Sequence, residues 1–360
     1  MSPEQAYALL QEHGTQTAAA AAAGVHRRTF ARWLDKLDPA VAKGMEIANT
    51  NLIPASMWIK TKTHSIQLKP QLQDQGAILD RMVEAFSAIP AFESRPAPVI
   101  LNEQLCTVYP LMDAHFGMLA WGRETGEQDY DLELARRDTI AAFESVMNLT
   151  PASAKAVLLI GGDALHADDS RAETPKSKHK LDVDGRHYRV LDSSILLLAE
   201  VAEKLLEKHG SLTIRVLRGN HDEHSHLVLT FALQQRYRAE PRVEVEDGAR
   251  DLFMFQWGRS AIFAHHGDKA KPQQLALYLS DVCPFWSETR HRHILTGHVH
   301  HDQAKDLGPV RWESLRAFCP PDAYAASMGY GGRRGLQALT FHTQNGCVLR
   351  AMDPIERQAA

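Results

Sequence analysis

From residue 105 onward, short apolar runs alternate with longer stretches in which apolar residues recur at helical spacing. The amphipathic stretches are Asp131–Met147 and Val190–Lys208. Continuous apolar runs are typical of strands that are buried on both faces, and such strands in alternation with helices predict an α/β layered core. The runs are Leu105–Met112, Ala156–Ile160, Leu212–Leu217, Ala261–Ala264 and His293–Thr296.

The first 37 residues have a different pattern, which predicts three short helices over Pro3–His13, Thr17–Ala23 and Arg27–Leu37. The break before the third helix lies where a helix-turn-helix has its tight turn, and the segment resembles the helix-turn-helix of recombinases and phage regulators. The alternative is a small helical module for oligomerisation or docking. As DNA contacts we expect the basic residues of the third helix, Arg27, Arg28 and Arg32.

Residues 38–104 show no sustained periodicity apart from a strand-like Ser56–Thr63 and a helix-like Asp80–Ser87, and they end in a proline-rich stretch. We therefore expect a connector with some structure of its own. It would join a helix-turn-helix module of residues 1–37 to an α/β domain of residues 105–352.

Composition narrows the class of protein but indicates no partner. With 44% hydrophobic residues in a chain of 360, the sequence can bury a large core, which excludes a disordered protein. A net charge of -4 gives no global field that would attract nucleic acid. The four cysteines form no closely spaced pair, and neither a signal peptide nor a long apolar segment is present, so we expect a cytoplasmic protein without a membrane span.

Histidine is the residue type that stands out. Of 19 histidines, 15 lie between His115 and His301. Imidazole is the commonest metal ligand in proteins and carries protons near neutral pH, so this segment is the candidate for a metal site.

Each of the five apolar runs is followed by polar side chains that can bind metal. One such cluster is weak evidence for a metal site, because an Asp or Asn at a strand end is often only part of a turn. Five clusters in succession, at the strand ends where α/β proteins collect their chemistry, indicate a site for two metals. The clusters are Asp113-Ala114-His115, Gly162-Asp163, Gly219-Asn220-His221-Asp222, His265-His266-Gly267-Asp268 and Gly297-His298-Val299-His300.

This order of motifs resembles the calcineurin-like metallophosphoesterase superfamily over about residues 105–350. The resemblance implies a four-layer α/β/β/α sandwich, with His221 as the catalytic histidine. His265 is an alternative to His266 as a ligand if the strand ends one residue earlier. The implied ligands are Asp113, His115 and His300 for the first metal, Asn220, His266 and His298 for the second, and Asp163 as the bridge between them.

The chemistry of these residue types agrees with the implied roles. Two divalent metals bind phosphate oxygens and lower the pKa of a bridging water, so that hydroxide can attack phosphorus at neutral pH. A protonated His221 can stabilise the phosphate oxygens or protonate the leaving alkoxide. Manganese is the metal that the resemblance favours, although nitrogen and oxygen ligands also accept iron, zinc, cobalt or nickel.

The segment Gly162–His166 has the form G-D-x-x-H, which resembles the nuclease branch of Mre11 and SbcD. Metallophosphoesterases of phages and prophages, some with an N-terminal helix-turn-helix, are similar as well. We expect His166 to lie near His221 and to help position the scissile phosphate or the leaving group; alternatively, it only caps the turn.

A long polar loop follows, in which Lys176, Lys178 and Lys180 alternate with Ser177 and His179. In an extended segment the lysines would lie on one side and could contact a phosphate backbone. The alternative is an ordinary solvated surface loop.

These observations predict a dinuclear metal-dependent phosphodiesterase, with DNA as the expected partner and a nuclease or DNA-end-processing activity favoured. A homodimer is possible in principle, and no sequence feature indicates an ATPase partner. Two alternatives remain open. The first is a phosphomonoesterase or a small-molecule or cyclic-nucleotide phosphodiesterase with a protein-docking module, and the second is a DNA-binding regulator with a vestigial site.

Overall fold

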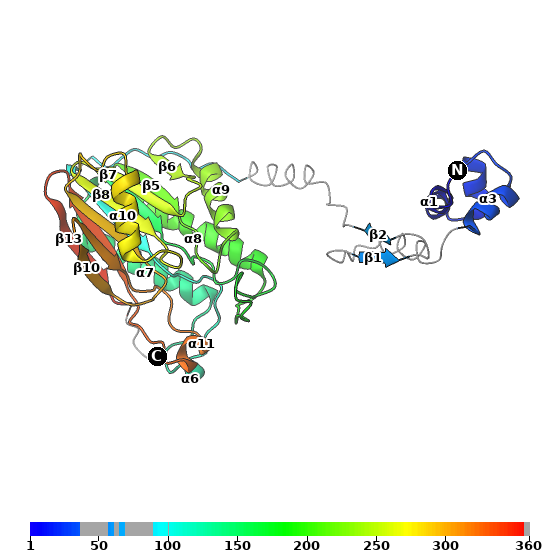
Figure 1. Ribbon diagram of the computed structural model, residues 1–360. Helices are drawn as coiled ribbons and strands as arrows, with labels where there is room; N and C mark the ends of the chain where they lie inside the picture. Colours follow the sequence, from blue (N-terminus) through cyan, green and yellow to red (C-terminus); the bar gives the residue numbers. More distant parts are fainter. Residues whose placement is uncertain (37–56, 61–64, 69–88, 100, 356–360) are drawn as a thin grey trace. The chain divides into compact units, whose positions relative to one another are not determined.

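The chain forms two compact units, Met1–Val83 and Glu84–Ala360. The helix expected over Asp80–Ser87 lies outside the described residues. The computed structural model, drawn in Figure 1, describes residues 1–36, 57–60, 65–68, 89–99 and 101–355.

The first unit contains the three expected N-terminal helices. Helix α1 (Pro3–His13) begins at Ser2, whose hydroxyl accepts the Gln5 N–H, and it is followed by Gly14 in the left-handed conformation. Helices α2 (Gln16–Ala22) and α3 (Arg27–Leu34) follow, the last ending three residues earlier than expected. Their shared core is formed by the buried side chains of Ala6, Ala19, Ala20 and Phe30.

Two short strands, β1 (Met57–Lys60) and β2 (Ser65–Leu68), pair antiparallel within the expected connector. Only the first was expected.

The second unit contains a six-stranded sheet built around the first three apolar runs. Its order is β13-β12-β3-β4-β5-β6; β3 to β6 are parallel, and β12 and β13 form an antiparallel hairpin. The strands are β3 (Asn102–Leu111), β4 (Ser153–Ile160), β5 (Ser211–Val216), β6 (Val243–Glu246), β12 (Leu336–His342) and β13 (Gly346–Asp353).

A five-stranded sheet contains the other two apolar runs, in the order β10-β11-β9-β8-β7. Strands β8, β9 and β11 are parallel, with an antiparallel strand at each edge. The strands are β7 (Leu252–Trp257), β8 (Ser260–His265), β9 (His291–Thr296), β10 (Gln303–Leu307) and β11 (Val310–Ser314).

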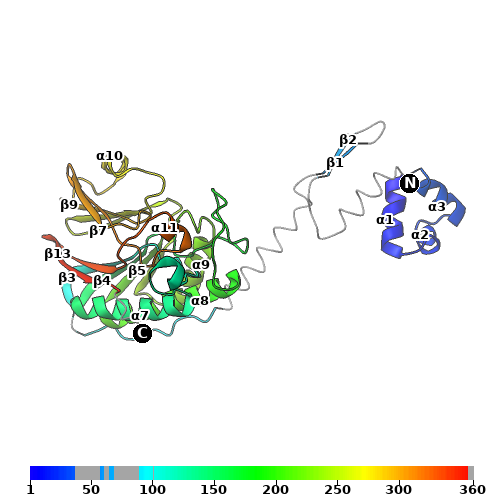
Figure 2. The same cartoon turned by 90° about the horizontal axis from the view of Figure 1, so that it is seen from below.

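Helices cover the outer faces of both sheets, as Figure 2 shows. The six-stranded sheet shares a core with α7 (Leu132–Leu149), α8 (His187–Lys208) and α9 (Ser225–Tyr237), and the five-stranded sheet with α10 (Pro272–Val282). The two sheets pack directly on each other through side chains such as Val108, Leu159, Phe253 and Leu295. The expected four-layer α/β/β/α sandwich is therefore confirmed.

Successive residues of β3 explain why the apolar runs are continuous. Tyr109 and Leu111 face the helices, whereas Cys106 and Val108 face the other sheet. Because both faces of the strand are buried, no position needs to be polar.

The second unit begins upstream of residue 105. The Phe92 ring lies 5.6 Å from that of Tyr237, and the Phe92 N–H donates to the Arg236 carbonyl. Strand β3 itself begins at Asn102. The last part of the expected connector thus packs on α9.

Among the helices in the described parts of the chain, none combines the length and apolar character that a membrane crossing requires.

Candidate metal centre

The strand ends that carry the candidate ligands meet at one edge of the two sheets. In the first sheet Leu111, Ile160 and Val216 are aligned in register at the ends of β3, β4 and β5. In the second sheet Ala264 of β8 is aligned with Leu295 of β9. The residues that follow these aligned positions therefore gather in one place. This is how motifs that lie far apart in the sequence come to form one site.

The backbone is strained at five of the proposed ligands. A positive φ is uncommon for residues other than glycine and costs about 1–3 kcal/mol, so it persists only where the surroundings enforce it. Of the eight such non-glycine residues in the described ranges, five are proposed ligands: Asp113, His115, Asp163, His298 and His300, with φ of 48°, 46°, 48°, 68° and 56°.

Two motif glycines allow the loops to approach one another closely. A Cβ at Gly219 would overlap Asp163 Oδ1, and a Cβ at Gly297 would overlap Asp113 Oδ2. Any other residue at either position would push a carboxylate out of the centre. The glycines of G-N-H and G-H-x-H are therefore needed for space.

Asp163 belongs to both of two groups of potential ligands. Its carboxylate groups with Asp113 and His115 on one side and with His266 and His298 on the other, and within each group the ligand atoms lie within 4.8 Å of one another. Asp163 Oδ2 lies 3.2 Å from His266 Nε2 and 3.9 Å from His115 Nε2. A carboxylate shared in this way can bridge two cations.

The loop after β9 contributes to the same centre through both backbone and side chain. The His298 N–H donates to both carboxylate oxygens of Asp113, at 3.1 and 2.9 Å. His300 Nε2 lies 3.4 Å from Asp113 Oδ1.

The geometry distinguishes His266 from His265. His266 Nδ1 donates to the Gly161 carbonyl at 3.1 Å, which leaves Nε2 beside Asp163 and 3.2 Å from Asn220 Oδ1. Fixing one ring nitrogen through a carbonyl is the usual way in which proteins orient a ligating histidine. His265 Nδ1 instead accepts the Gly267 N–H at 2.9 Å.

Two features of the donor set fit bound cations. His115 Nε2 is buried and has no hydrogen-bond partner, an arrangement that costs free energy unless a ligand uses the atom. Burial lowers the pKa of His266, but the nearby Asp163 and Asp113 carboxylates outweigh it and raise this pKa to about 10. The carboxylates therefore favour positive charge beside them. The residues that would hold divalent cations here are Asp113, His115, Asp163, Asn220, His266, His298 and His300.

His221 lies beside this centre and is held by its backbone and its ring. The His221 N–H donates to Asp163 Oδ1 at 2.7 Å, and Nδ1 donates to the His166 carbonyl at 2.8 Å. That bond leaves Nε2 as the ring atom that can reach a substrate.

His166 also lies where it was expected, with its ring stacked 5.4 Å from that of His221. Its Nδ1 is 3.0 Å from His115 Nδ1, and burial lowers the pKa of the ring to about 3. A ring that is neutral at pH 7 is a poor acid. The hydrogen bond between the two residues comes instead from the His166 backbone carbonyl.

Two residues of the centre were not predicted from the sequence. Buried Asp222 accepts the N–H groups of Gly219 and Ala164, at 2.7 and 2.8 Å, and so ties two ligand loops together. Cys319 donates its N–H to the Asp113 carbonyl, and its thiol lies near His115 and His300. Asp222 is visible in the G-N-H-D motif, but no sequence signal indicates Cys319.

The proposed DNA contacts fall into two groups. Arg27, Arg28 and Arg32 are exposed on α3. The lysine loop is not extended, because the Thr174 N–H donates to the His179 carbonyl and Lys178 has a φ of 57°. The extended conformation that would place the three lysines on one side is therefore absent. All three lysines are exposed, and Lys180 pairs with Glu173 at 2.7 Å.

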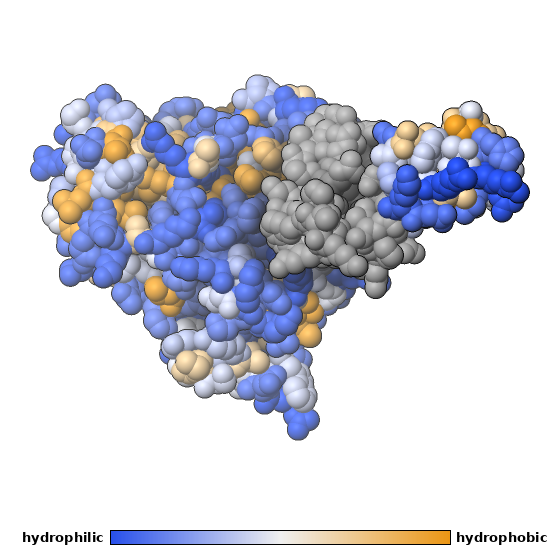
Figure 3. Space-filling model, turned by 45° about the vertical axis from the view of Figure 1, so that its right-hand side comes forward, coloured by the Kyte–Doolittle hydropathy of each residue, from blue (hydrophilic) through white to orange (hydrophobic). Residues whose placement is uncertain are grey.

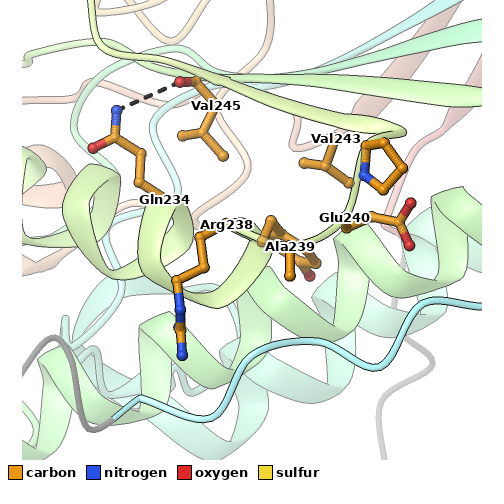
Figure 4. Close-up of a pocket in the computed structure, with 8 residues that line it drawn as sticks. Gln234, Arg238, Ala239, Glu240, Val243 and Val245 are labelled. Atoms are coloured by element: carbon orange, nitrogen blue, oxygen red, sulfur yellow. Dashed lines mark hydrogen bonds between the residues drawn. The ribbon is translucent and has the colours of Figure 1, made fainter.

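A cavity of about 430 Å³ lies away from the metal centre, at the corner between α9 and β6 (Figure 4). Its wall includes Gln234, whose amide donates to the Val245 carbonyl, and Glu240. None of the proposed ligands lines it.

Replacing His266 with alanine is expected to remove about one metal ion per chain, because its Nε2 faces Asp163 and Asn220. His265→Ala is the matched control and should retain the wild-type metal content. The measurement is the metal-to-protein ratio after dialysis against a limiting metal concentration. Loss of metal from the His265 variant alone would reverse the assignment.

No protein-family model matches the chain, and no curated protein matches it. Several solved structures do. A phosphoesterase from Escherichia coli has 14% identity and a TM-score of 0.35, with 69% of this chain and 100% of that one covered. A novel archaeal phosphodiesterase has 10% identity and a TM-score of 0.34, covering 65% and 92%. A predicted phosphoesterase from Streptococcus pneumoniae has 13% identity and a TM-score of 0.31, covering 70% and 99%. At this level of similarity the activity of these proteins does not transfer to this chain.

Proposed function

We propose that this protein is a dinuclear metal-dependent phosphodiesterase that cleaves DNA. The observation that carries the proposal is the position of Asp163, shared between two groups of ligands and bonded to the backbone of His221. A phosphate ester seated on that centre would lie next to His221, which is not among the proposed ligands and whose ring is oriented by the His166 carbonyl.

The chemistry divides between the metals and the protein. When bound, two divalent metals supply Lewis acidity and a water of lowered pKa. Asp163 and Asp113 offset only part of the positive charge, so the centre attracts an anionic phosphate. His221, with Nδ1 held by the His166 carbonyl at 2.8 Å, presents Nε2 to the phosphate oxygens or the leaving oxygen. Manganese is the metal we favour, because the resemblance of the motifs to those of metallophosphoesterases implies it; the nitrogen and oxygen donors would also accept iron, zinc, cobalt or nickel.

The first unit supports DNA as the substrate. Helix α3 buries Phe30 and exposes Arg27, Arg28 and Arg32, and Figure 3 shows strongly hydrophilic residues on this unit. Exposed arginines on the helix after a tight turn are the arrangement with which a helix-turn-helix contacts DNA. The form G-D-x-x-H at Gly162–His166 also favours a nuclease over a monoesterase.

The test is cleavage of end-labelled single-stranded and duplex oligonucleotides with manganese. We expect cleavage by the wild type and a raised KM for DNA in the double variant Arg28→Ala, Arg32→Ala, with a weaker dependence on salt. The matched control, Arg290→Ala with Lys305→Ala, removes the same charge from exposed positions and should retain the wild-type KM.

Hydrolysis of bis(4-nitrophenyl) phosphate with all DNA left intact would contradict the DNA proposal. It would instead favour a small-molecule phosphodiesterase whose first unit docks to a protein. Absence of hydrolysis on every ester, with metal bound, would contradict a phosphodiesterase of any kind.

A further inference from the structure

A cavity of about 380 Å³ is lined in part by the residues that directly follow His115 and His166 in the chain. These residues are Phe116 and Gly117 after His115, and Ala167 after His166. The loops after β3 and β4 thus supply both the two histidines and part of the cavity wall.

The lining of this cavity combines flat apolar walls with polar edges. Phe116, Val183 and Val190 provide the apolar part, and Asp169 and His187 provide polar atoms. The Asp169 carboxylate is fixed by Arg171, whose Nε donates to it at 2.8 Å and holds its pKa below the ordinary value. Burial lowers the pKa of His187, so its neutral ring offers one donor and one acceptor. A nucleobase, with apolar faces and hydrogen-bonding edges, is complementary to such a lining.

Exposed aromatic side chains surround the same region. Tyr188, in the first turn of α8, lines the cavity although its residue is 81% exposed. Trp121, before α6 (Gly122–Thr125), and Tyr324, in α11 (Ala323–Ser327), are 56% and 54% exposed. Aromatic rings left in water near a phosphate-binding centre are the stacking surfaces with which proteins hold single-stranded nucleic acid.

Three contacts tie these aromatic residues to the cavity and the centre. The Leu119 N–H donates to the Asp182 carbonyl, which places the segment before Trp121 against the cavity loop. Helices α6 and α11 contact each other, as Figure 1 also shows, and the Tyr324 ring lies 5.7 Å from His179 of the lysine loop. Cys319, which lies beside His115 and His300, leads directly into α11.

Cations accompany these rings. The Arg123 guanidinium lies 5.3 Å from the centre of the Trp121 ring, and Lys176 and Lys178 are exposed on the adjoining loop. Aromatic rings interleaved with cations suit a strand whose bases are free to stack while its phosphates are neutralised.

We propose that the cavity beside His166 binds the base of the nucleotide next to the scissile bond, so that the enzyme acts on unpaired strands. This inference rests on the proposed function, because it assigns the substrate class of the same centre. A base that is paired in a duplex cannot enter a cavity, so a duplex must first open or fray.

Two diesters with the same leaving group isolate the contribution of the base: thymidine 5′-(4-nitrophenyl phosphate) and methyl 4-nitrophenyl phosphate. We expect the wild-type protein with manganese to show a kcat/KM for the nucleoside diester higher by about 5- to 150-fold, the range that stacking of one base supports. The difference should lie mainly in KM.

Variants of residues that line the cavity test whether the cavity causes the preference for the nucleoside diester. Tyr188→Ala and the cavity-filling Ser170→Trp should both reduce the ratio of the two kcat/KM values towards unity, whereas Tyr188→Phe, which keeps the ring, should restore it. Ser170 is an exposed loop residue, so its replacement is compatible with folding. Tyr278→Ala on α10 is the matched control, since it removes another exposed tyrosine.

The second arm compares a single-stranded oligonucleotide with its duplex. Cleavage of the single strand should be faster, and Tyr188→Ala should diminish this difference. Two results would overturn the base-binding inference while leaving the nuclease proposal standing. One is equal or faster cleavage of the duplex. The other is a ratio of the kcat/KM values for the two diesters that neither Tyr188→Ala nor Ser170→Trp changes. Hydrolysis of both diesters with no cleavage of either oligonucleotide would overturn the nuclease proposal, and the unpaired-strand inference with it.

Discussion

Replacing His221 with alanine is expected to lower kcat for an oligonucleotide by roughly 10²–10⁴-fold, the range for loss of a general acid or base. The substitution removes the side-chain bond to the His166 carbonyl but keeps the bond to Asp163, because the His221 backbone N–H makes it. Metal content should therefore remain at the wild-type level. The measurement is single-turnover cleavage alongside the metal-to-protein ratio.

Two substrates with different leaving groups test whether His221 acts as an acid or only positions the phosphate. A nitrophenolate departs without a proton, whereas the sugar alkoxide of DNA needs one. The His221→Ala variant should therefore lose more activity on DNA than on nitrophenyl esters. His224→Ala is the matched control in the same loop, since that side chain is 82% exposed and bonds to Asp168. An equal loss on both substrates, or loss of metal, would contradict the role of His221 as an acid.

Replacing Asp163 with alanine is expected to abolish activity, because one substitution removes the carboxylate shared by both groups of ligands. Metal affinity should fall by more than the roughly 10–100-fold that loss of an outer-shell partner costs. The measurement is metal binding by calorimetry, followed by hydrolysis of a nitrophenyl diester at saturating metal.

Asp163→Asn distinguishes charge from shape, because it keeps an oxygen that can accept the His221 N–H but loses the negative charge. It should bind metal more weakly than the wild type and more strongly than Asp163→Ala. Asp281→Asn, at an exposed position of α10, is the control for the loss of one charge. Two metals retained at wild-type affinity in Asp163→Ala would show that Asp163 does not bridge them.

The layered core was predictable because strands buried on both faces have few polar positions. The run Leu105–Met112 stands out for this reason, and the aligned ends of β3, β4 and β5 follow from parallel pairing. Strands that lack such burial were missed: β10 reads Gln-Ala-Lys-Asp-Leu at a sheet edge and is exposed for nearly its whole length. A polar edge strand has no periodicity that separates it from a loop.

The site was predictable to the extent that its residues lie directly after strands. Asp113, Asp163 and His266 do so, and the structure brings them together. Cys319 could not be predicted, because it reaches Asp113 only through the long return of the chain from β11 to β12. The conformation of the lysine loop could not be predicted either. A backbone hydrogen bond between Thr174 and His179 closes the loop, and the alternating charges of the sequence do not indicate this bond.

We propose a two-metal centre for phosphodiester hydrolysis at the edge shared by the two sheets. The decisive experiment is titration of the metal-free protein with manganese, with hydrolysis of bis(4-nitrophenyl) phosphate followed in the same samples. We expect binding of about two ions per chain and a rate that appears only as the second ion binds. Full hydrolysis by metal-free protein, or saturation at a single ion with full activity, would contradict this proposal.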